Sequence, residues 1–79
     1  MTREAIFEKL TEVFRDVFDD EEIVLEESTN AMDIEEWDSL AQISLIVAIE
    51  QEFSIKFTMQ EVTEMKNVGE MVSVLLERV

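Results

Sequence analysis

The stretch Trp37-Asp38-Ser39-Leu40, continued by an apolar run to Phe53, decides the fold of this chain. It ends a long acidic connection and begins the most regular helical pattern in the sequence. Apolar residues recur there at three- and four-residue steps and predict a helix over residues 38–53. They are Leu40, Ile43, Ile46, Val47, Ile49 and Phe53, with Leu45 and Ala48 beside them. So many apolar positions predict a helix largely surrounded by other helices. Asp38 or Ser39 is the expected N-cap, because both residue types are preferred there.

Three more helices are expected on either side of this stretch. Residues 2–18 place Ile6, Leu10, Val13, Phe14 and Val17 on one face. The pair Thr58 and Glu61 fits a capping box that starts a short helix ending near residue 65, and Asn67 with Glu70 forms a similar box. The last helix runs to the C-terminus with Val68, Met71, Val72, Leu75 and Val79 on one face. The pattern predicts an all-α four-helix bundle of three main helices and one short helix, built from residues 1–79 as a single domain.

The connection over residues 19–36 is unusually long for so small a chain. It opens with Asp19-Asp20-Glu21-Glu22, a like-charge run that disfavours further helix. Ile23 and Leu25 are expected to pin it to the core. Loops longer than about 12–15 residues are often functional in compact domains.

Composition excludes several classes of function. The 79 residues include twenty acidic and six basic residues, no cysteine and no histidine, for a net charge of −14. The chain therefore has no histidine base to activate a serine nucleophile, no cysteine nucleophile and none of the usual ligands of a structural zinc site, so it is not expected to be an enzyme or to bind a metal. Such acidity argues against nucleic acid and favours basic surfaces on other proteins. Without an apolar run of membrane length or a signal peptide, a soluble cytoplasmic domain is expected.

Ser39 lies where a helix is expected to begin. Unpaired backbone N–H groups and the helix dipole favour a phosphate at that position. From the residues alone, Ser39 is either an N-cap, the commonest use of serine there, or an attachment point for a phosphoryl-linked group.

The residues around Ser39 extend that second interpretation. Glu36-Trp37-Asp38-Ser39-Leu40, followed by Ile43, Leu45-Ile46, the segment Ile49–Phe53 and Ile55, resembles the acyl carrier proteins. These are small acidic helical bundles that carry a 4'-phosphopantetheine arm, derived from coenzyme A, on the serine of an Asp-Ser-Leu motif. The resemblance implies that Ser39 is attached to the arm by a separate phosphopantetheinyl transferase, with Asp38 and Leu40 as its motif neighbours. Asp38 then either orients the modifying enzyme or its metal, or simply caps the helix.

The same resemblance implies a function and a partner surface. The arm supplies the thiol that this chain lacks, so that acyl intermediates travel as thioesters between enzymes of fatty acid, lipid or specialised biosynthesis. Glu50, Glu61 and Glu64, with Leu40 as an apolar contact, are expected to meet basic patches on synthases and transferases; the alternative is a solvated face. Trp37 either packs at the junction, partly buried, or stands exposed as an aromatic anchor for partners. A monomer is expected.

Some positions depart from the common fatty-acid carrier pattern. Ala41 and Ser44 stand where acids are usual, and Thr58 replaces a frequent proline. A dedicated pathway, a carrier for amino acid or polyketide units, and an acidic interaction module that never receives the arm therefore stay open. The apolar residues Phe53, Phe57, Met65 and Met71 are expected to be plain core, with an interior that shelters the acyl chain as the alternative.

Overall fold

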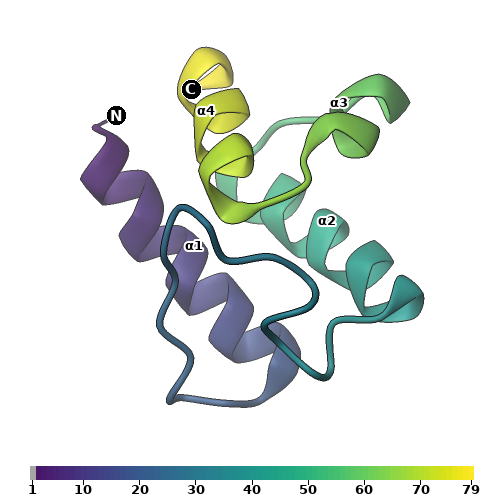
Figure 1. Ribbon diagram of the computed structural model, residues 1–79. Helices are drawn as coiled ribbons and strands as arrows, with labels where there is room; N and C mark the ends of the chain where they lie inside the picture. The colour runs from purple at the N-terminus through teal and green to yellow at the C-terminus, as the bar shows by residue number, and fades with distance from the viewer. Residues whose placement is uncertain (1) are drawn as a thin grey trace.

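The computed structural model describes residues 2–79 and contains four α-helices (Figure 1). They are α1 (Arg3–Phe18), α2 (Ser39–Phe53), α3 (Met59–Glu64) and α4 (Val68–Arg78). Residues 19–38 form a long loop between α1 and α2, and no strand occurs within residues 2–79. The predicted bundle of three main helices and one short helix is confirmed.

Helix α1 packs against both α2 and α4. Thr2 caps its start, because the Thr2 Oγ1 accepts the N–H of Ala5 at 3.1 Å. The predicted face is buried, except that Val17 is only partly covered; its buried residues are Ile6, Leu10, Val13 and Phe14. The helix ends at Asp19, whose φ of 49° places it in the left-handed region.

Helix α2 corrects a prediction. Only Leu45, Ile49 and Phe53 are buried in it, whereas the side chains predicted beside them, Leu40, Ile43 and Val47, are exposed. At 3.6 residues per turn, these two sets lie on opposite sides of the helix. The small bundle covers only one of the two sides, so the prediction that other helices surround α2 is wrong.

The α1–α2 loop is fixed to the bundle rather than loose. Ile23 and Leu25 are each 9% exposed, as predicted for anchors. The N–H groups of Val68 and Gly69 donate to the backbone carbonyls of Thr29 and Glu27 at 2.8 and 2.9 Å. These carbonyls satisfy two N–H groups that the start of α4 would otherwise leave unpaired.

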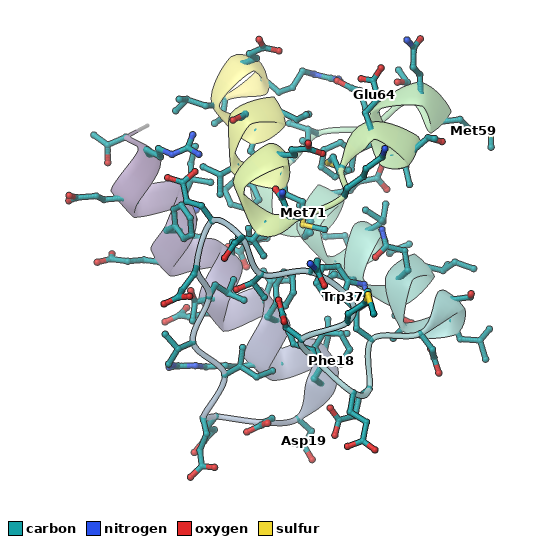
Figure 2. The ribbon with its side chains drawn as sticks, in the orientation of Figure 1. Phe18, Asp19, Trp37, Met59, Glu64 and Met71 are labelled. Carbon is teal, nitrogen blue, oxygen red and sulfur yellow. The ribbon has the colours of Figure 1, made fainter. Side chains whose placement is uncertain are left out.

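The predicted capping box at α3 is confirmed. The N–H of Glu61 donates to Thr58 Oγ1 at 3.1 Å, and the N–H of Thr58 donates to Glu61 Oε1 at 2.9 Å. No residue of α3 itself is buried. Figure 2 shows Met59 at the outer edge of this helix, pointing away from the bundle. The capping box at its start and the partly buried Val62 therefore connect α3 to the rest of the bundle.

Helix α4 forms only half of its predicted box. Asn67 Oδ1 accepts the N–H of Glu70 at 2.8 Å, but the Glu70 carboxylate accepts the N–H of Lys66 instead of that of Asn67. Val79 lies just past the end of the helix and is 43% exposed, so its predicted place in the core is wrong. The other predicted residues are fully buried: Val68, Met71, Val72 and Leu75 (Met71 is labelled in Figure 2).

Candidate functional site

Ser39 is the first residue of α2, and Asp38 is its N-cap. The Asp38 carboxylate accepts the N–H of Ala41 at 2.8 Å, and the Asp38 carbonyl accepts the N–H of Gln42 at 2.9 Å. Capping by Asp38 leaves the Ser39 hydroxyl without a hydrogen-bond partner within residues 2–79, and the residue is exposed. The choice between the two predicted caps therefore falls on Asp38, and Ser39 presents a free hydroxyl at a helix start.

Trp37 holds the end of the loop against α1. Its side chain is 7% exposed, and its ring meets Phe14 edge-on at 5.2 Å between centroids and an interplanar angle of 84°. Its indole N–H donates to the Gln42 side-chain oxygen. The interpretation as buried packing is therefore confirmed, and the expectation that Trp37 contacts partners directly is wrong because almost none of its surface is accessible.

A groove of about 550 Å³ opens beside Ser39. One part of its lining comes from the end of the loop and the start of α2, with Trp37, Ser39 and Gln42. Another part comes from Met65 and Lys66 in the linker between α3 and α4. The groove therefore combines apolar surface with a cation and an amide next to the free hydroxyl.

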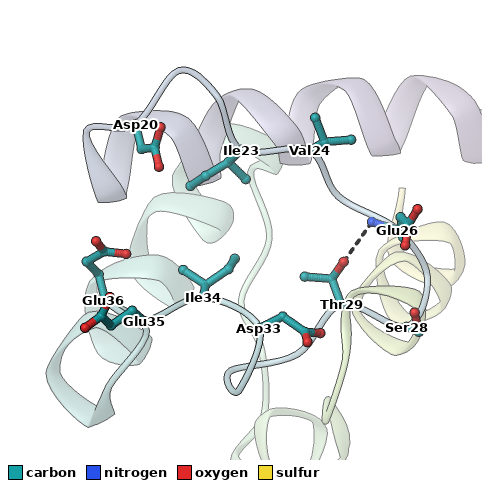
Figure 3. Close-up of a pocket in the computed structure, with 10 residues that line it drawn as sticks. All are labelled: Asp20, Ile23, Val24, Glu26, Ser28, Thr29, Asp33, Ile34, Glu35 and Glu36. Atoms are coloured by element: carbon teal, nitrogen blue, oxygen red, sulfur yellow. Dashed lines mark hydrogen bonds between the residues drawn. The ribbon is translucent and has the colours of Figure 1, made fainter.

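A second pocket lies within the α1–α2 loop (Figure 3), and Ser39 is not among its lining residues. Its lining includes Ile23, Ile34 and five acidic residues, and Thr29 Oγ1 accepts the N–H of Glu26 there at 2.9 Å. Residues 2–79 contain no group of three or more acidic side chains placed to hold a metal ion. All the residues that line this pocket belong to the loop, between residues 20 and 36.

The outer face of α2 carries an exposed apolar stripe formed by Leu40, Ile43 and Val47, which are 77%, 64% and 46% exposed. Exposed apolar patches mark interaction surfaces more often than isolated exposed residues do. The sequence predicts Leu40 as a partner contact, whereas it places Ile43 and Val47 on the buried face of the helix. Their spacing of three and four residues from Leu40 to Val47 is the signal that could have identified a second stripe.

The three acids expected on the partner surface differ in what they do. Glu50 Oε2 accepts the N–H of Phe57 at 2.8 Å, which ties α2 to the segment before α3. Glu61 belongs to the capping box and pairs with the Arg78 guanidinium at 2.7 Å. Glu64 is exposed on α3 (Figure 2). Of the three, Glu50 and Glu61 therefore stabilise the fold; the sequence pattern predicts the capping box of Glu61 but neither its pairing with Arg78 nor the contact of Glu50 with Phe57.

Hydrogen bonding and an ion pair alter the acidity of Glu61. The backbone N–H of Thr58, followed by the Arg78 side chain, lowers the pKa of Glu61 below its ordinary value of 4.5. Both interactions favour the charged form of the carboxyl group. Glu61 is thus charged at neutral pH, but Arg78 offsets much of the charge that a partner would meet.

Comparisons with known proteins agree with this geometry. A family model described as a phosphopantetheine attachment site matches residues 8–75. The chain is 32% identical to the acyl carrier protein of Lactobacillus acidophilus over 73 residues, which cover 92% of this chain and 91% of that protein. It is 33% identical over 81 residues to the acyl carrier protein of Petrotoga mobilis, with coverages of 99% and 92%.

A solved structure shares the fold. The holo acyl carrier protein from Geobacter metallireducens superimposes with a TM-score of 0.86 at 44% sequence identity, covering 90% of this chain and 82% of that one.

Within residues 2–79, every helix is too short or too polar to cross a lipid bilayer.

Proposed function

This chain belongs to the phosphopantetheine-binding acyl carrier protein family, and from that premise we propose that Ser39 is the residue that receives the 4'-phosphopantetheine arm. The family carries acyl groups on this prosthetic group, whose terminal thiol holds them as thioesters. The free, exposed hydroxyl of Ser39 supports the assignment most directly, because Asp38 already caps α2. The start of α2 also favours an anion, since its first backbone N–H groups point outward.

Asp38 has a structural part in this proposal. Its carboxylate holds the N–H of Ala41, so it fixes the first turn of α2 and with it the position of Ser39. An additional role in orienting the modifying enzyme or its metal is compatible with its exposed position. Ser39 itself needs no base within the chain, because a separate phosphopantetheinyl transferase activates it.

The chain acts as a single carrier domain over residues 1–79 and catalyses no step itself. It contains neither histidine nor cysteine, and its net charge of −14 suits enzymes with basic faces. We assign partner contact to the exposed stripe Leu40, Ile43 and Val47 on α2, and to Glu64 as the exposed acid of α3. Rim charges of this kind act mainly on association rate and salt dependence.

One experiment tests the attachment site. The protein is incubated with coenzyme A and a broad-range phosphopantetheinyl transferase, and its intact mass is measured. The wild type and Ser44→Ala, which removes another exposed serine of α2, are expected to gain the mass of the arm, whereas Ser39→Ala is expected to gain nothing. An unchanged wild-type mass would instead support an acidic interaction module that never receives the arm.

The cargo is a separate question. Fatty acyl, amino acid and polyketide units all travel as thioesters on such an arm, and the loading enzymes choose among them. Ala41 and Ser44, which stand in α2 where acids are usual in fatty-acid carriers, favour a dedicated pathway over exchange with a general fatty-acid carrier. Incubating the holo protein with a loading enzyme for each of these three classes of cargo, and measuring which one attaches its unit to the arm, distinguishes the three possibilities.

A further inference from the structure

Lys66 is a basic residue without an ion-pair partner in a strongly acidic chain. Arg3, Lys9 and Arg78 pair with Glu27, Glu52 and Glu61, respectively. Within residues 2–79, no carboxylate oxygen lies within 4.0 Å of the Lys66 ammonium group, although acids outnumber basic residues twenty to six. Glu70 lies close to Lys66, but it accepts the backbone N–H and leaves the ammonium group free.

The unpaired charge of Lys66 belongs to the groove beside Ser39. Lys66 lines the groove of about 550 Å³ that also contains Ser39, and it is the one basic residue in that lining. The single acid there, Asp38, already holds the N–H of Ala41 with its carboxylate. An anion in the groove therefore meets one cation that is in no ion pair, and this cation offsets the negative charge of the Asp38 carboxylate in the same lining.

Two other lining residues fit an elongated group that is partly polar. Gln42 uses its side-chain oxygen for the Trp37 indole, and its NH₂ group donates no hydrogen bond within residues 2–79. Met65 adds apolar surface from the same linker as Lys66. A flexible chain of amide and methylene groups that leaves Ser39 thus finds a donor and an apolar wall beside it.

We propose that Lys66 is a positioning residue for the prosthetic arm: its ammonium group faces the phosphodiester on Ser39 and draws the arm into the groove between the start of α2 and the α3–α4 linker. This inference rests on the proposed attachment at Ser39. The pairing is charge-assisted but partly solvated, so it biases the arm between docked and free states by about two- to fivefold.

The test compares apo and holo proteins by NMR. Transfer of the arm to the wild type is expected to shift the backbone amides of Met65 and Lys66, the side-chain amide of Gln42 and the indole N–H of Trp37. In Lys66→Gln these apo-to-holo shifts are expected to fall to half or less, and the ³¹P resonance of the phosphodiester is expected to move. Lys66→Arg keeps the charge and is expected to behave as the wild type.

Lys56→Gln is the matched control, because it removes one exposed lysine that does not line the groove. It is expected to leave both the amide shifts and the ³¹P resonance as in the wild type. Equal effects of Lys56→Gln and Lys66→Gln, or no effect of Lys66→Gln on an arm shown by mass to be attached, overturn the inference. Absence of any arm on the wild type overturns the proposed function instead.

Discussion

The backbone carbonyl oxygen of Glu27 accepts the N–H of Gly69 at 2.9 Å, and a Cβ atom added to Gly69 would lie at the same distance, 2.9 Å, from that oxygen. The long loop and the start of α4 are therefore in contact at a point with no space for a side chain. The preceding residue, Val68, donates its N–H to the carbonyl of Thr29 in the same loop. Two neighbouring hydrogen bonds therefore attach the start of α4 to the loop that leads to Ser39.

Gly69→Ala is therefore expected to destabilise the protein, although alanine is the better helix former. Propensity favours alanine by about 1 kcal/mol, whereas overpacking costs about 1–3 kcal/mol and a weakened hydrogen bond about 1 kcal/mol more. The expected net loss is about 1–3 kcal/mol, measured by urea unfolding. Ser44→Ala, at an exposed position of α2, is the control and should be neutral or slightly stabilising. If Gly69→Ala were as stable as the wild type or more stable, the loop would have to move away from the added methyl group at little cost in free energy.

Ser54→Gly is expected to stabilise the protein. Ser54 ends α2 with a φ of 55°, a left-handed conformation that costs a residue with a Cβ about 1–2 kcal/mol and glycine very little. Part of this gain is lost to the greater freedom of glycine in the unfolded chain, so an increase of about 0.5–1 kcal/mol is expected.

The matched control makes the same substitution inside the helix. Ser44→Gly is expected to lower stability by about 0.5 kcal/mol, because the backbone there is helical and glycine is a poor helix former. Thermal melts of the two variants should therefore move in opposite directions. Shifts of the same sign would contradict the role given to the backbone angle.

Periodicity predicted α1 well because α1 has a single apolar stripe. Ile6, Leu10 and Phe14 follow one another at four-residue steps, and each is fully buried. The same rule failed for α2, which has two apolar stripes on opposite sides. A sequence pattern identifies both, but which one is covered depends on where α1 lies, and that is a property of the tertiary fold.

The candidate site was predicted in part. Asp38 and Ser39 are both suitable N-caps, so only the observed start of α2 at Ser39 separates their roles. The pairing of Glu61 with Arg78 joins residues 17 positions apart. No local spacing rule predicts this contact, so the sequence pattern places Glu61 in the capping box and on the partner surface but does not reveal its pairing with Arg78.

The lowered pKa of Glu61 leads to a prediction about pH. A carboxyl group whose pKa is lower in the folded state stabilises the fold above its unfolded pKa, and this contribution is lost as the pH falls through the folded value. Glu61→Gln should therefore melt at a lower temperature than the wild type at about pH 7, and the difference should shrink below the ordinary value of 4.5. Thermal melts over a pH series measure it.

The control for this prediction is Glu8→Gln. Glu8 is exposed on α1 and takes part in no cap or ion pair within residues 2–79. Its replacement by glutamine therefore removes the same charge as Glu61→Gln without removing such a contact. Its melting temperature should equal or exceed that of the wild type at about pH 7, since it relieves repulsion among acids. A difference between the wild type and Glu61→Gln that is constant over the whole pH series would rule out the assigned cause.

Salt is expected to stabilise the protein. A net charge of −14 on 79 residues produces self-repulsion, which ions screen once the Debye length falls to about 10 Å. The melting temperature should rise from about 10 mM to about 200 mM sodium chloride. Glu21→Lys, in the exposed run after α1, changes the net charge from −14 to −12 and should show a smaller rise. A flat or falling curve for the wild type would indicate that repulsion does not limit stability.

The two sides of α2 should separate partner binding from folding. Leu40 is 77% exposed and Leu45 is fully buried, so the same truncation to alanine acts on different properties. Leu45→Ala is expected to cost about 2–5 kcal/mol of stability. Leu40→Ala should change stability by no more than about 0.5 kcal/mol but lower kcat/KM for arm transfer by about fivefold or more, as for an interface residue worth about 1 kcal/mol.

Thermal melts and steady-state kinetics with the same transferase measure both effects. Because Leu40 adjoins Ser39, Val47→Ala extends the test along the stripe to a residue two turns away that is 46% exposed. Enzymes that contact the whole outer face of α2 should respond to both substitutions, whereas an enzyme that recognises only the attachment motif should respond to Leu40→Ala alone. Wild-type kinetics for both variants would mean that these apolar side chains are exposed without serving recognition, and the partner surface would have to lie elsewhere on the bundle.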